Sequence, residues 1–365
     1  MPRSRVLFLL AMGLLLGVHP MLAATFAVGP CKPTLVSFPT ISAAVSTVPP
    51  GSTVLVCPGT YPEQVTIAQP LTLKGITSGN AGQAVITVPG SGLTVVTTGL
   101  GDQIAAMVDV TAGPVNISDI TVDGIGYSVS LPNWLVGILY NDGSSGTVNE
   151  ITARNLNTSG GTGMGVWAEN STGTNQLVTI ENSSFHDIDN SGVITLGSTL
   201  FATVKGNTVE FGHYQLQFLS AGNFTANVIS GGGYTGITAF GPNTVSGNTV
   251  NDSIYGIQAY SGVTATSNKI SNVSWGIYDF GGGSSNTYKS NAITKTGIGI
   301  DFNCQTPTVL SNTINDANIG LNNVPSSFSG ANSFNNVVTL RNDGCGFRPT
   351  PPAASPSGPL GAPAH

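Results

Sequence analysis

The chain has 365 residues, a formal net charge of −6 at pH 7 and only 8% charged residues, whereas an average soluble domain has about 25%. An acidic chain whose few basic residues form no cluster argues against nucleic acid as a partner. Its surface has to be covered by Asn, Ser, Thr and Gly, which suits an extracellular protein.

The N-terminal segment, residues 1–24, is predicted to be a secretory signal peptide. Arg3 and Arg5 precede an apolar stretch, and the small residues Ala23 and Ala24 follow it. A permanent membrane anchor is the alternative, but a glycine, a histidine and a proline interrupt the apolar stretch. We therefore predict a protein that is secreted, extracellular or periplasmic, with no membrane span after removal of the signal.

The four cysteines fall into two pairs by location, Cys31 with Cys57 and Cys304 with Cys345. In an exported protein an even number of cysteines favours disulfides. Metal binding is the less favoured alternative, because no Cys-x-x-Cys motif or histidine cluster accompanies them. We predict the disulfides Cys31–Cys57 and Cys304–Cys345 and no metal site.

The central part of the chain repeats about every 21 residues, a period typical of stacked solenoids. The mark of the repeat is an asparagine, present at Asn182, Asn207, Asn227, Asn248, Asn268, Asn291 and Asn312, with Asn155 in an earlier, longer coil. Each of these asparagines is expected to occupy a left-handed turn and to bond the same amide one coil away.

Three apolar positions travel with the asparagine, one before it and two after it. The last of them follows a glycine, as in Gly256-Ile257, Gly276-Ile277 and Gly299-Ile300. The segments around these anchors are short and rich in strand-forming residues. Burying an aliphatic side chain contributes about 1.5–3 kcal/mol, too little to offset the ordering of a whole coil at about 1–2 kcal/mol per residue. Coils must therefore stack, which predicts an all-β parallel β-helix over residues 61–346.

From roughly Phe38 to Val338 the chain resembles the right-handed parallel β-helix repeat proteins of the pectate-lyase-like superfamily. The most specific stretch is FPTISAAVSTVPPGSTVLVCPGTYPEQVTIAQPLTLKG, residues 38–75. The resemblance implies a single-stranded right-handed solenoid of three sheets. It also implies a short capping helix at about Ile41–Val48, within an N-terminal cap of residues 25–60. After Phe347 the sequence PTPPAASPSGPLGAPAH predicts a disordered tail over residues 347–365.

In related enzymes the outward face of the glycine-containing strand forms the floor of a polysaccharide cleft. Here that face carries aromatic rings, amides and a carboxylate, at Trp167, Gln217, Phe240, Gln258, Tyr260, Tyr278, Phe280 and Asp301. Rings stack on sugars and polar groups bond their hydroxyls, so we predict a polysaccharide or cell-surface glycan as the partner.

Two alternatives to the glycan-binding face remain open. Strand aromatics also pack against one another across strands, and the leucines and isoleucines nearby suggest a covering loop. A second aromatic row, at Tyr214, Tyr234, Tyr255 and Trp275, is interpreted as a structural stack at a corner.

The candidate catalytic residues are Glu169, Asp187, Asp189, Glu210 and His213. Paired acids could act as general acid and base on a glycosidic bond, or could hold calcium for a lyase. The alternative for each acid is a solvated or turn-capping residue. The fingerprints of polygalacturonases and pectin methylesterases are absent from the sequence, which favours a non-enzyme. A lyase, hydrolase or epimerase and an adhesive or structural module stay open, and no cofactor is predicted unless a lyase uses calcium.

Overall fold

The computed structural model describes residues 24–77, 82–127, 133–210, 212–282 and 285–344. The predicted signal peptide, apart from Ala24, and the predicted tail lie outside these residues. Cys345 also lies outside them, so the disulfide with Cys304 stays a prediction. No helix within the described ranges is long and apolar enough to span a membrane.

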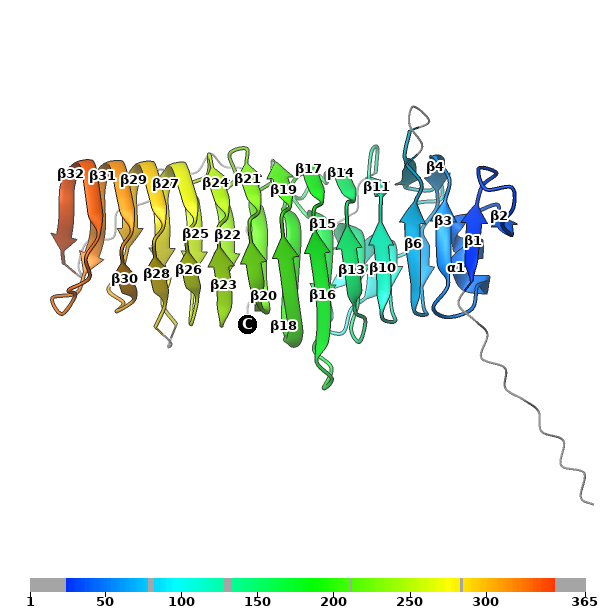
Figure 1. Ribbon diagram of the computed structural model, residues 1–365, viewed down its shortest axis with the longest axis horizontal. Coiled ribbons are helices and arrows are strands. Elements are labelled where there is room, and N and C mark those ends of the chain that lie inside the picture. Colours follow the sequence, from blue (N-terminus) through cyan, green and yellow to red (C-terminus); the bar gives the residue numbers. More distant parts are fainter. Residues whose placement is uncertain (1–23, 78–81, 128–132, 211, 283–284, 345–365) are drawn as a thin grey trace, which may run out of the picture.

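The strands stack along the long axis of the molecule in chain order (Figure 1). The first ladder of pairings contains β1 (Thr25–Val28), β3 (Thr53–Val56), β6 (Leu71–Gly75), β10 (Val115–Ser118), β13 (Gly146–Asn149), β16 (Gln176–Glu181), the later parts of β18 (Ser191–Lys205) and β20 (Tyr214–Thr225), β23 (Asn243–Ser246), β26 (Thr264–Thr266), β28 (Thr287–Lys289) and β30 (Thr308–Leu310).

The second ladder contains β4 (Gly59–Pro62), β7 (Ala84–Thr87), β11 (Ile120–Asp123), β14 (Thr152–Leu156), β17 (Ser184–Ile188), β19 (Thr208–Glu210), β21 (Val228–Ser230), β24 (Thr249–Asn251) and the first parts of β27 (Lys269–Asp279), β29 (Ala292–Asp301), β31 (Thr313–Val324) and β32 (Ser333–Asp343). The third contains β5 (Val65–Ile67), β9 (Gln103–Val110), β12 (Trp134–Tyr140), β15 (Gly163–Glu169), the first parts of β18 and β20, β22 (Thr235–Ala239), β25 (Tyr255–Ala259) and the later parts of β27, β29, β31 and β32. β2 (Ser37–Phe38) pairs with β1, and β8 (Val96–Thr97) pairs with β9 as the antiparallel exception among these parallel pairings.

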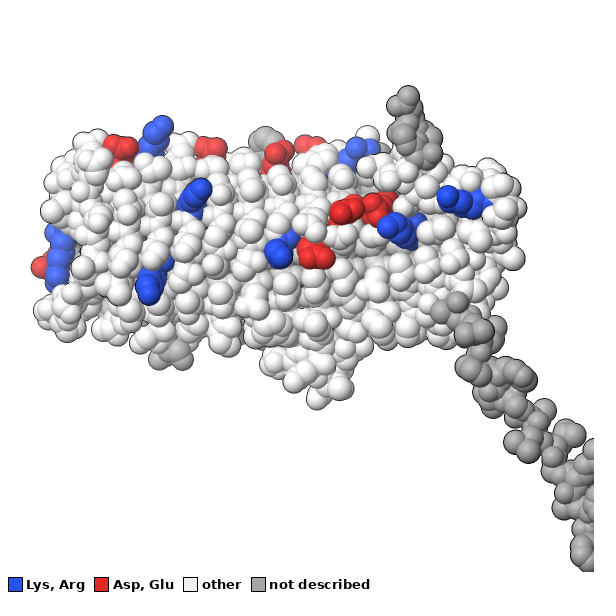
Figure 2. Space-filling view, viewed as in Figure 1, with Lys and Arg blue, Asp and Glu red and all other residues white. Residues whose placement is uncertain are grey.

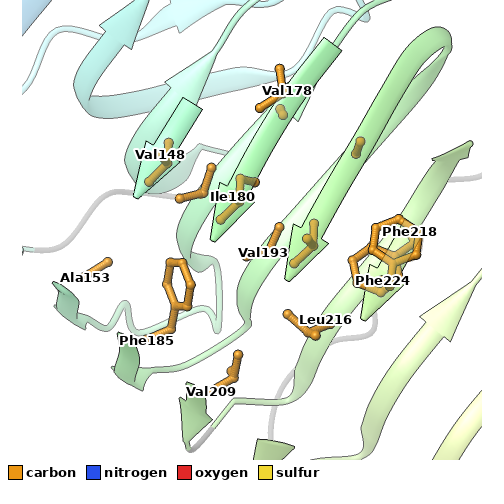
Figure 3. Packing of buried hydrophobic residues seen from close by; sticks show 14 of the residues in the cluster. Val148, Ala153, Val178, Ile180, Phe185, Val193, Val209, Leu216, Phe218 and Phe224 are labelled. Carbon is orange, nitrogen blue, oxygen red and sulfur yellow. The ribbon is translucent and has the colours of Figure 1, made fainter. Parts of the chain in front are cut away.

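Each coil passes through the first, second and third ladders in turn, and the predicted parallel β-helix of three sheets is confirmed. The apolar anchors meet in the interior, as Figure 3 shows for residues such as Val148, Phe185 and Leu216. Ile257 and Ile277 are paired in register and fully buried. Adjacent coils therefore bury the same side of each strand, which explains why the period persists.

The glycine before each of these aliphatic residues also faces the interior. A Cβ on Gly256 would lie 2.5 Å from Cγ2 of Ile270, a core residue on the second ladder. Real Cβ atoms do not approach so closely, and overpacking a core costs about 1–3 kcal/mol. A side chain at Gly256 would therefore force its core neighbours to shift, whereas the coil of Gln215 holds a buried glutamine at the corresponding position.

The asparagines form a ladder from Asn207 to Asn332 that is buried as far as Asn312 and half-buried at Asn332. Oδ1 of Asn248 accepts both the backbone N–H and the side-chain N–H of Asn227, each at 2.9 Å. The amide of Asn248 in turn donates to Oδ1 of Asn268 at 3.0 Å. The predicted amide contact between coils is confirmed, and Asn332 extends it beyond the predicted set.

Two details of the asparagine prediction are wrong. The left-handed residue is the one before the ladder asparagine, such as Ala226 with φ 56°. Asn182, with φ 52°, stands one residue off the ladder, and Ser183 holds the ladder position and bonds Oδ1 of Asn207 at 3.0 Å. Asn155 is also left-handed and lies outside the ladder. The residue type alone does not show whether an asparagine occupies the left-handed turn or the ladder position that follows it.

The predicted short helix is α1 (Ile41–Thr47), which lies beside β1 and β3 at the N-terminal end (Figure 1). Its first N–H groups are satisfied because Ile41 and Ser42 donate to the carboxylate of Glu63, each at 2.8 Å. Ile41, Ala44 and Val45 are buried in the main core. Parallel pairing already begins in β1, inside the segment 25–60 that was assigned to the cap.

The disulfide Cys31–Cys57 is confirmed, with the two Cα atoms 5.7 Å apart. Cys57 directly follows β3, and Cys31 lies in the turn after β1. The bond therefore joins the first two coils where β1 and β3 end.

Candidate functional site: the aromatic face of the third ladder

Each coil of the aromatic region presents three outward positions on the third ladder, which in one coil are Trp275, Tyr278 and Phe280. Because the glycine and the following aliphatic residue both face the interior, the residue before the glycine points outward, as does the residue after the aliphatic one. Tyr255 and Tyr278 hold these two positions on adjacent coils, and their ring centroids are 5.5 Å apart. Tyr278 also contacts Phe280 at 5.5 Å. The two aromatic rows that the sequence suggested thus form one surface.

We call this surface the aromatic face, and its rings belong to His213, Tyr214, Tyr234, Phe240, Tyr255, Tyr260, Trp275, Tyr278 and Phe280. The row before the glycines was interpreted as a structural stack at a corner, and this agrees with Tyr255 and Trp275, which are 6% and 5% exposed and whose rings stack at 4.9 Å. The contact of this row with the row of Tyr278 was not expected. The signal that could have joined the rows was the glycine itself, since an inward glycine shifts the alternation of the strand by one residue.

Three rings of the aromatic face stack in a column along the solenoid. The centroids of Phe240 and Tyr260 are 3.6 Å apart, and those of Tyr260 and Phe280 are 4.4 Å apart, with interplanar angles of 15° and 24°. Both faces of Tyr260 are therefore covered by its neighbours. Phe280 ends the column and is 47% exposed, so it is the ring of this column that can stack on a sugar.

The tyrosine hydroxyls gather over the middle of the face. Burial raises the pKa of Tyr260 to about 12, with further contributions from the phenols of Tyr214, Tyr234 and Tyr278. Burial and the neighbouring tyrosines also raise the pKa of Tyr255. These phenols stay protonated at neutral pH, and each is able to donate and accept hydrogen bonds.

A polar row runs between the aromatic rows, with Gln217, Thr238 and Gln258 side by side on adjacent coils. Nε2 of Gln217 donates to Oγ of Ser191 at 2.6 Å, and Oε1 of Gln258 accepts from Oγ1 of Thr235 at 3.2 Å. Oγ1 of Thr238 is buried and has no hydrogen-bond partner among the described residues. A buried hydroxyl without a partner is costly, and a ligand or a water would satisfy it.

An open depression of about 410 Å³ adjoins the aromatic face. Tyr234 and His213 belong to both, and their rings stack at 5.3 Å. Three predicted catalytic residues, Asp187, Asp189 and His213, line the depression together. Its volume falls within the range of about 300–1,000 Å³ that ligand sites occupy.

The groups in the depression differ in their freedom to react. Asp189 accepts hydrogen bonds from the backbone N–H groups of Thr158 and Gly163, and burial raises its pKa. Asp187 is exposed and lies 2.7 Å from Nδ1 of His186. Burial lowers the pKa of His213, which is therefore neutral at pH 7. Asp187 is the acid with the most open access.

The other two predicted acids do not join this group. Glu169 is the last residue of β15, whereas Asp189 bonds Gly163, the first residue. At about 3.3 Å per residue, the length of β15 places Glu169 about 20 Å from Asp189. Glu210 is exposed on β19, next to His186 on the adjacent coil, and does not line the depression.

Glu169 and Trp167 are sealed within the protein, being 1% and 2% exposed. The indole N–H of Trp167 donates to Glu169 at 2.9 Å, and the N–H of Leu100 donates to its other oxygen at 3.4 Å. Burial raises the pKa of Glu169. Both side chains hold in place the segment that contains β8 and Leu100, which we call the covering segment. Neither therefore presents a free group to a ligand.

Asp301 is also occupied by the fold. Its carboxylate accepts from the backbone N–H of Asn303 and from the amides of Asn322 and Asn323, all at 2.9 Å, and it is 1% exposed. These contacts stabilise the coils beyond the aromatic face. A ligand therefore has no open path to the carboxylate of Asp301, for which the sequence predicted a ligand-binding role.

No sequence profile of a known family matches the chain, and no curated protein matches it. Among solved structures, the chain is similar to the GH136 lacto-N-biosidase of Eubacterium ramulus, with 10% identity, 87% of this chain and 68% of that chain covered, and a TM-score of 0.57. It is also similar to the A-module of the mannuronan C-5 epimerase AlgE6 of Azotobacter vinelandii, with 16% identity, coverage of 82% and 94%, and a TM-score of 0.42.

A further similar structure is PfbA, a surface adhesin of Streptococcus pneumoniae, with 12% identity, coverage of 82% and 87%, and a TM-score of 0.34. At these identities the likeness concerns the fold alone. The evidence for the fold comes from the lacto-N-biosidase, because the TM-scores of the other two structures are below 0.5. The strand pairings and this likeness together agree with the fold that the superfamily resemblance implied. The chain is a right-handed parallel β-helix protein.

Proposed function

We propose that this protein is exported and binds a glycan along the aromatic face without converting it. The observation that carries the proposal is the stretch of the third ladder where the half-buried Tyr278 and the exposed Phe280 border a row of amides and hydroxyls, of which Gln217 is half-buried and Thr238 and Gln258 lie just below the surface at 5% exposed. Aromatic side chains with a few placed polar groups are the usual composition of ligand sites. The confirmed disulfide and the predicted signal peptide support export.

Binding without conversion is favoured by the state of the carboxylates. A glycosidase needs two carboxyl groups separated by about 5–9.5 Å, both able to reach the scissile bond. Glu169 and Asp301 are buried and bonded, and Asp189 is held by backbone N–H groups. Asp187 alone would not supply both roles.

The test compares two aromatic substitutions on the face with one elsewhere. Phe280→Ala removes the exposed end ring, and Tyr278→Ala removes the ring beside it. Each is expected to weaken binding in a panel of soluble polysaccharides by about 1–2 kcal/mol, or about 5- to 30-fold. The control is Phe201→Ala, since Phe201 is 43% exposed on the first ladder. Absent binding, or equal binding by the wild type and all three variants, would contradict the proposal. The remaining interpretation would then be an adhesive or structural module.

A polysaccharide lyase, hydrolase or epimerase is the second candidate. It is favoured by the presence of Asp187 and the neutral His213 in one depression. The same panel is incubated with the protein and analysed for new reducing ends, unsaturated products and changed sugar configuration. Products that disappear with Asp187→Asn would establish conversion and replace the binding-only proposal.

A further inference from the structure

The described lysines and arginines all lie away from the aromatic face. Lys74, Lys205 and Lys289 belong to the first ladder, Arg154, Lys269 and Lys295 to the second ladder and the turn after it, and Lys32 to the N-terminal segment. Arg341 is on the third ladder, but in the last coil, three coils beyond that of Tyr278. Charges are also sparse on the side of the molecule in view in Figure 2, where most of the surface is white. A ligand on the aromatic face therefore meets no cationic side chain of the described coils.

Two buried carboxylates lie beside the outer end of this face, Asp301 and Asp279, the second of which stands between Tyr278 and Phe280 and faces the interior. Asp301 stands beside Tyr278 on the next coil, buried beneath its amide partners. Its position in register with Tyr278 puts a negative charge one coil, about 4.8 Å, beyond that ring. An anion placed over Tyr255 and Tyr278 would be repelled, and partial burial would add a desolvation cost.

The groups that do face a ligand are uncharged hydrogen-bonding groups. Tyr214, Tyr234 and Tyr278 surround the Tyr260 hydroxyl closely enough to affect its ionisation. Thr238, whose Oγ1 has no partner among the described residues, lies between Gln217 and Gln258 on the adjacent coils. Phenols, amides and a threonine hydroxyl both donate and accept, as sugar hydroxyls do. This chemistry matches a neutral sugar and offers nothing to a carboxylate.

We infer that the aromatic face selects a neutral glycan and discriminates against polysaccharides rich in uronate. The inference rests on the proposed function, because it names the class of glycan that the same surface takes. Selectivity arises from the uncharged face and from the repulsion by Asp301. The ligand's hydroxyls then contact the tyrosines, and its apolar ring face stacks on the exposed end of Phe280.

The test uses polysaccharides that differ only in charge. Polygalacturonate, alginate and a glucuronan are each compared with their carboxyl-reduced, neutral forms, together with neutral xylan and β-glucan. Binding is measured by calorimetry at 50 and 500 mM NaCl. We expect any pair that binds to favour the reduced form by about 10-fold or more, with an affinity that changes little with salt, because screening acts only between charges.

The outcomes separate this inference from the proposed function. Preference for the acid form, with affinity lost in Phe280→Ala, would overturn the neutral selectivity and leave the glycan-binding face intact. Failure of every polysaccharide to bind, or binding unaffected by Phe280→Ala, would overturn the proposed function and this inference with it. A preference for the neutral form, together with affinity that is weakened in Phe280→Ala, supports both.

A designed charge provides an independent check. Gln217→Lys places a cation in the polar row between the tyrosines, and Gln217→Met is the matched uncharged control. We expect Gln217→Lys to improve binding of the acid forms about 5-fold relative to Gln217→Met, because an exposed ion pair contributes up to about 1 kcal/mol. Thr238→Val, which keeps the shape of the side chain, is expected to weaken neutral binding about 2- to 10-fold. No change in either variant would place the ligand away from this row and overturn the inference.

Discussion

The coils before Ser183 and the coils after it stabilise the same fold by different means. The earlier coils lack the asparagine ladder, and their outward third-ladder face is an apolar cluster that includes Leu139, Met164 and Trp167. The segment that contains β8 pairs with β9 and packs on that cluster through Val96. The later coils have the ladder and carry the aromatic face, whose rings range from 5% exposed at Trp275 to 47% at Phe280. In the later coils the hydrogen bonds of the asparagine ladder stabilise the stack. The aromatic face is thus left for another role.

The covering segment of the earlier coils is held by polar contacts at both of its ends. At one end the side chain of Gln64 donates to the carbonyls of Thr94 and Ala106 at 2.9 and 2.8 Å. At the other end Glu169 accepts from Leu100 and also bonds Thr98. A face that is covered in this way is unavailable to a ligand, which limits the candidate site to the later coils.

The largest predicted effect comes from breaking the asparagine ladder. Asn248→Ala leaves the backbone and side-chain N–H groups of Asn227 without their acceptor, and removes the donor to Asn268. Each buried group left unpaired costs about 1–3 kcal/mol, so we expect unfolding free energy to fall by about 3–5 kcal/mol. Chemical denaturation followed by circular dichroism measures it. An unchanged midpoint would show that the ladder does not stabilise the later coils.

A smaller loss is predicted for the contact that holds the covering segment. Glu169→Ala leaves the buried indole N–H of Trp167 without an acceptor and frees the segment near Leu100. We expect a loss of about 2–3 kcal/mol and faster amide exchange at Leu100. Glu210→Ala is the matched control, because Glu210 is exposed, and should change stability by less than about 0.5 kcal/mol. Equal effects in the two variants would contradict the assigned role of Glu169.

Asp109 predicts a dependence of stability on pH in the covered half. It is 4% exposed, and burial raises its pKa to about 6 from an ordinary value of 3.8. Between about pH 4 and about pH 6 the folded state binds more protons than the unfolded state. The free energy of unfolding therefore falls as pH rises through this range. Asp109→Asn removes that loss and should raise stability at pH 7 by about 1–2 kcal/mol, with the gain fading toward pH 4.

The control for Asp109 is Glu150→Gln at an exposed position. Asp279, whose pKa burial also raises to about 6, contributes a slope of the same sign in every variant. The comparison is therefore made between each variant and the wild type at each pH. A gain that is the same at pH 4 and pH 7 would mean that the ionisation of Asp109 does not cause it.

The sequence predicted the features that depend on position within a repeat, and missed those that depend on contacts in space. The alignment of Ile257 with Ile277 follows from periodicity, because stacked coils bury the same side of each strand. The environment of Glu169 does not, since the segment that seals it is distant in sequence and belongs to no repeat. The width of the aromatic face was missed although the sequence carried its signal, because alternation was counted forward from the aliphatic residue, whereas the inward Gly256 also turns Tyr255 outward.

The smallest predicted effect is at the asparagine that lies off the ladder. Asn182 is exposed, has φ 52° and makes one side-chain bond, to Asn149 at 2.9 Å. Asn182→Gly keeps the left-handed backbone that glycine adopts without strain, so we expect a loss of less than about 0.5 kcal/mol, set by the exposed hydrogen bond. The measurement is the same denaturation experiment as for Asn248→Ala. A loss as large as that of Asn248→Ala would mean that Asn182, rather than Ser183, begins the ladder.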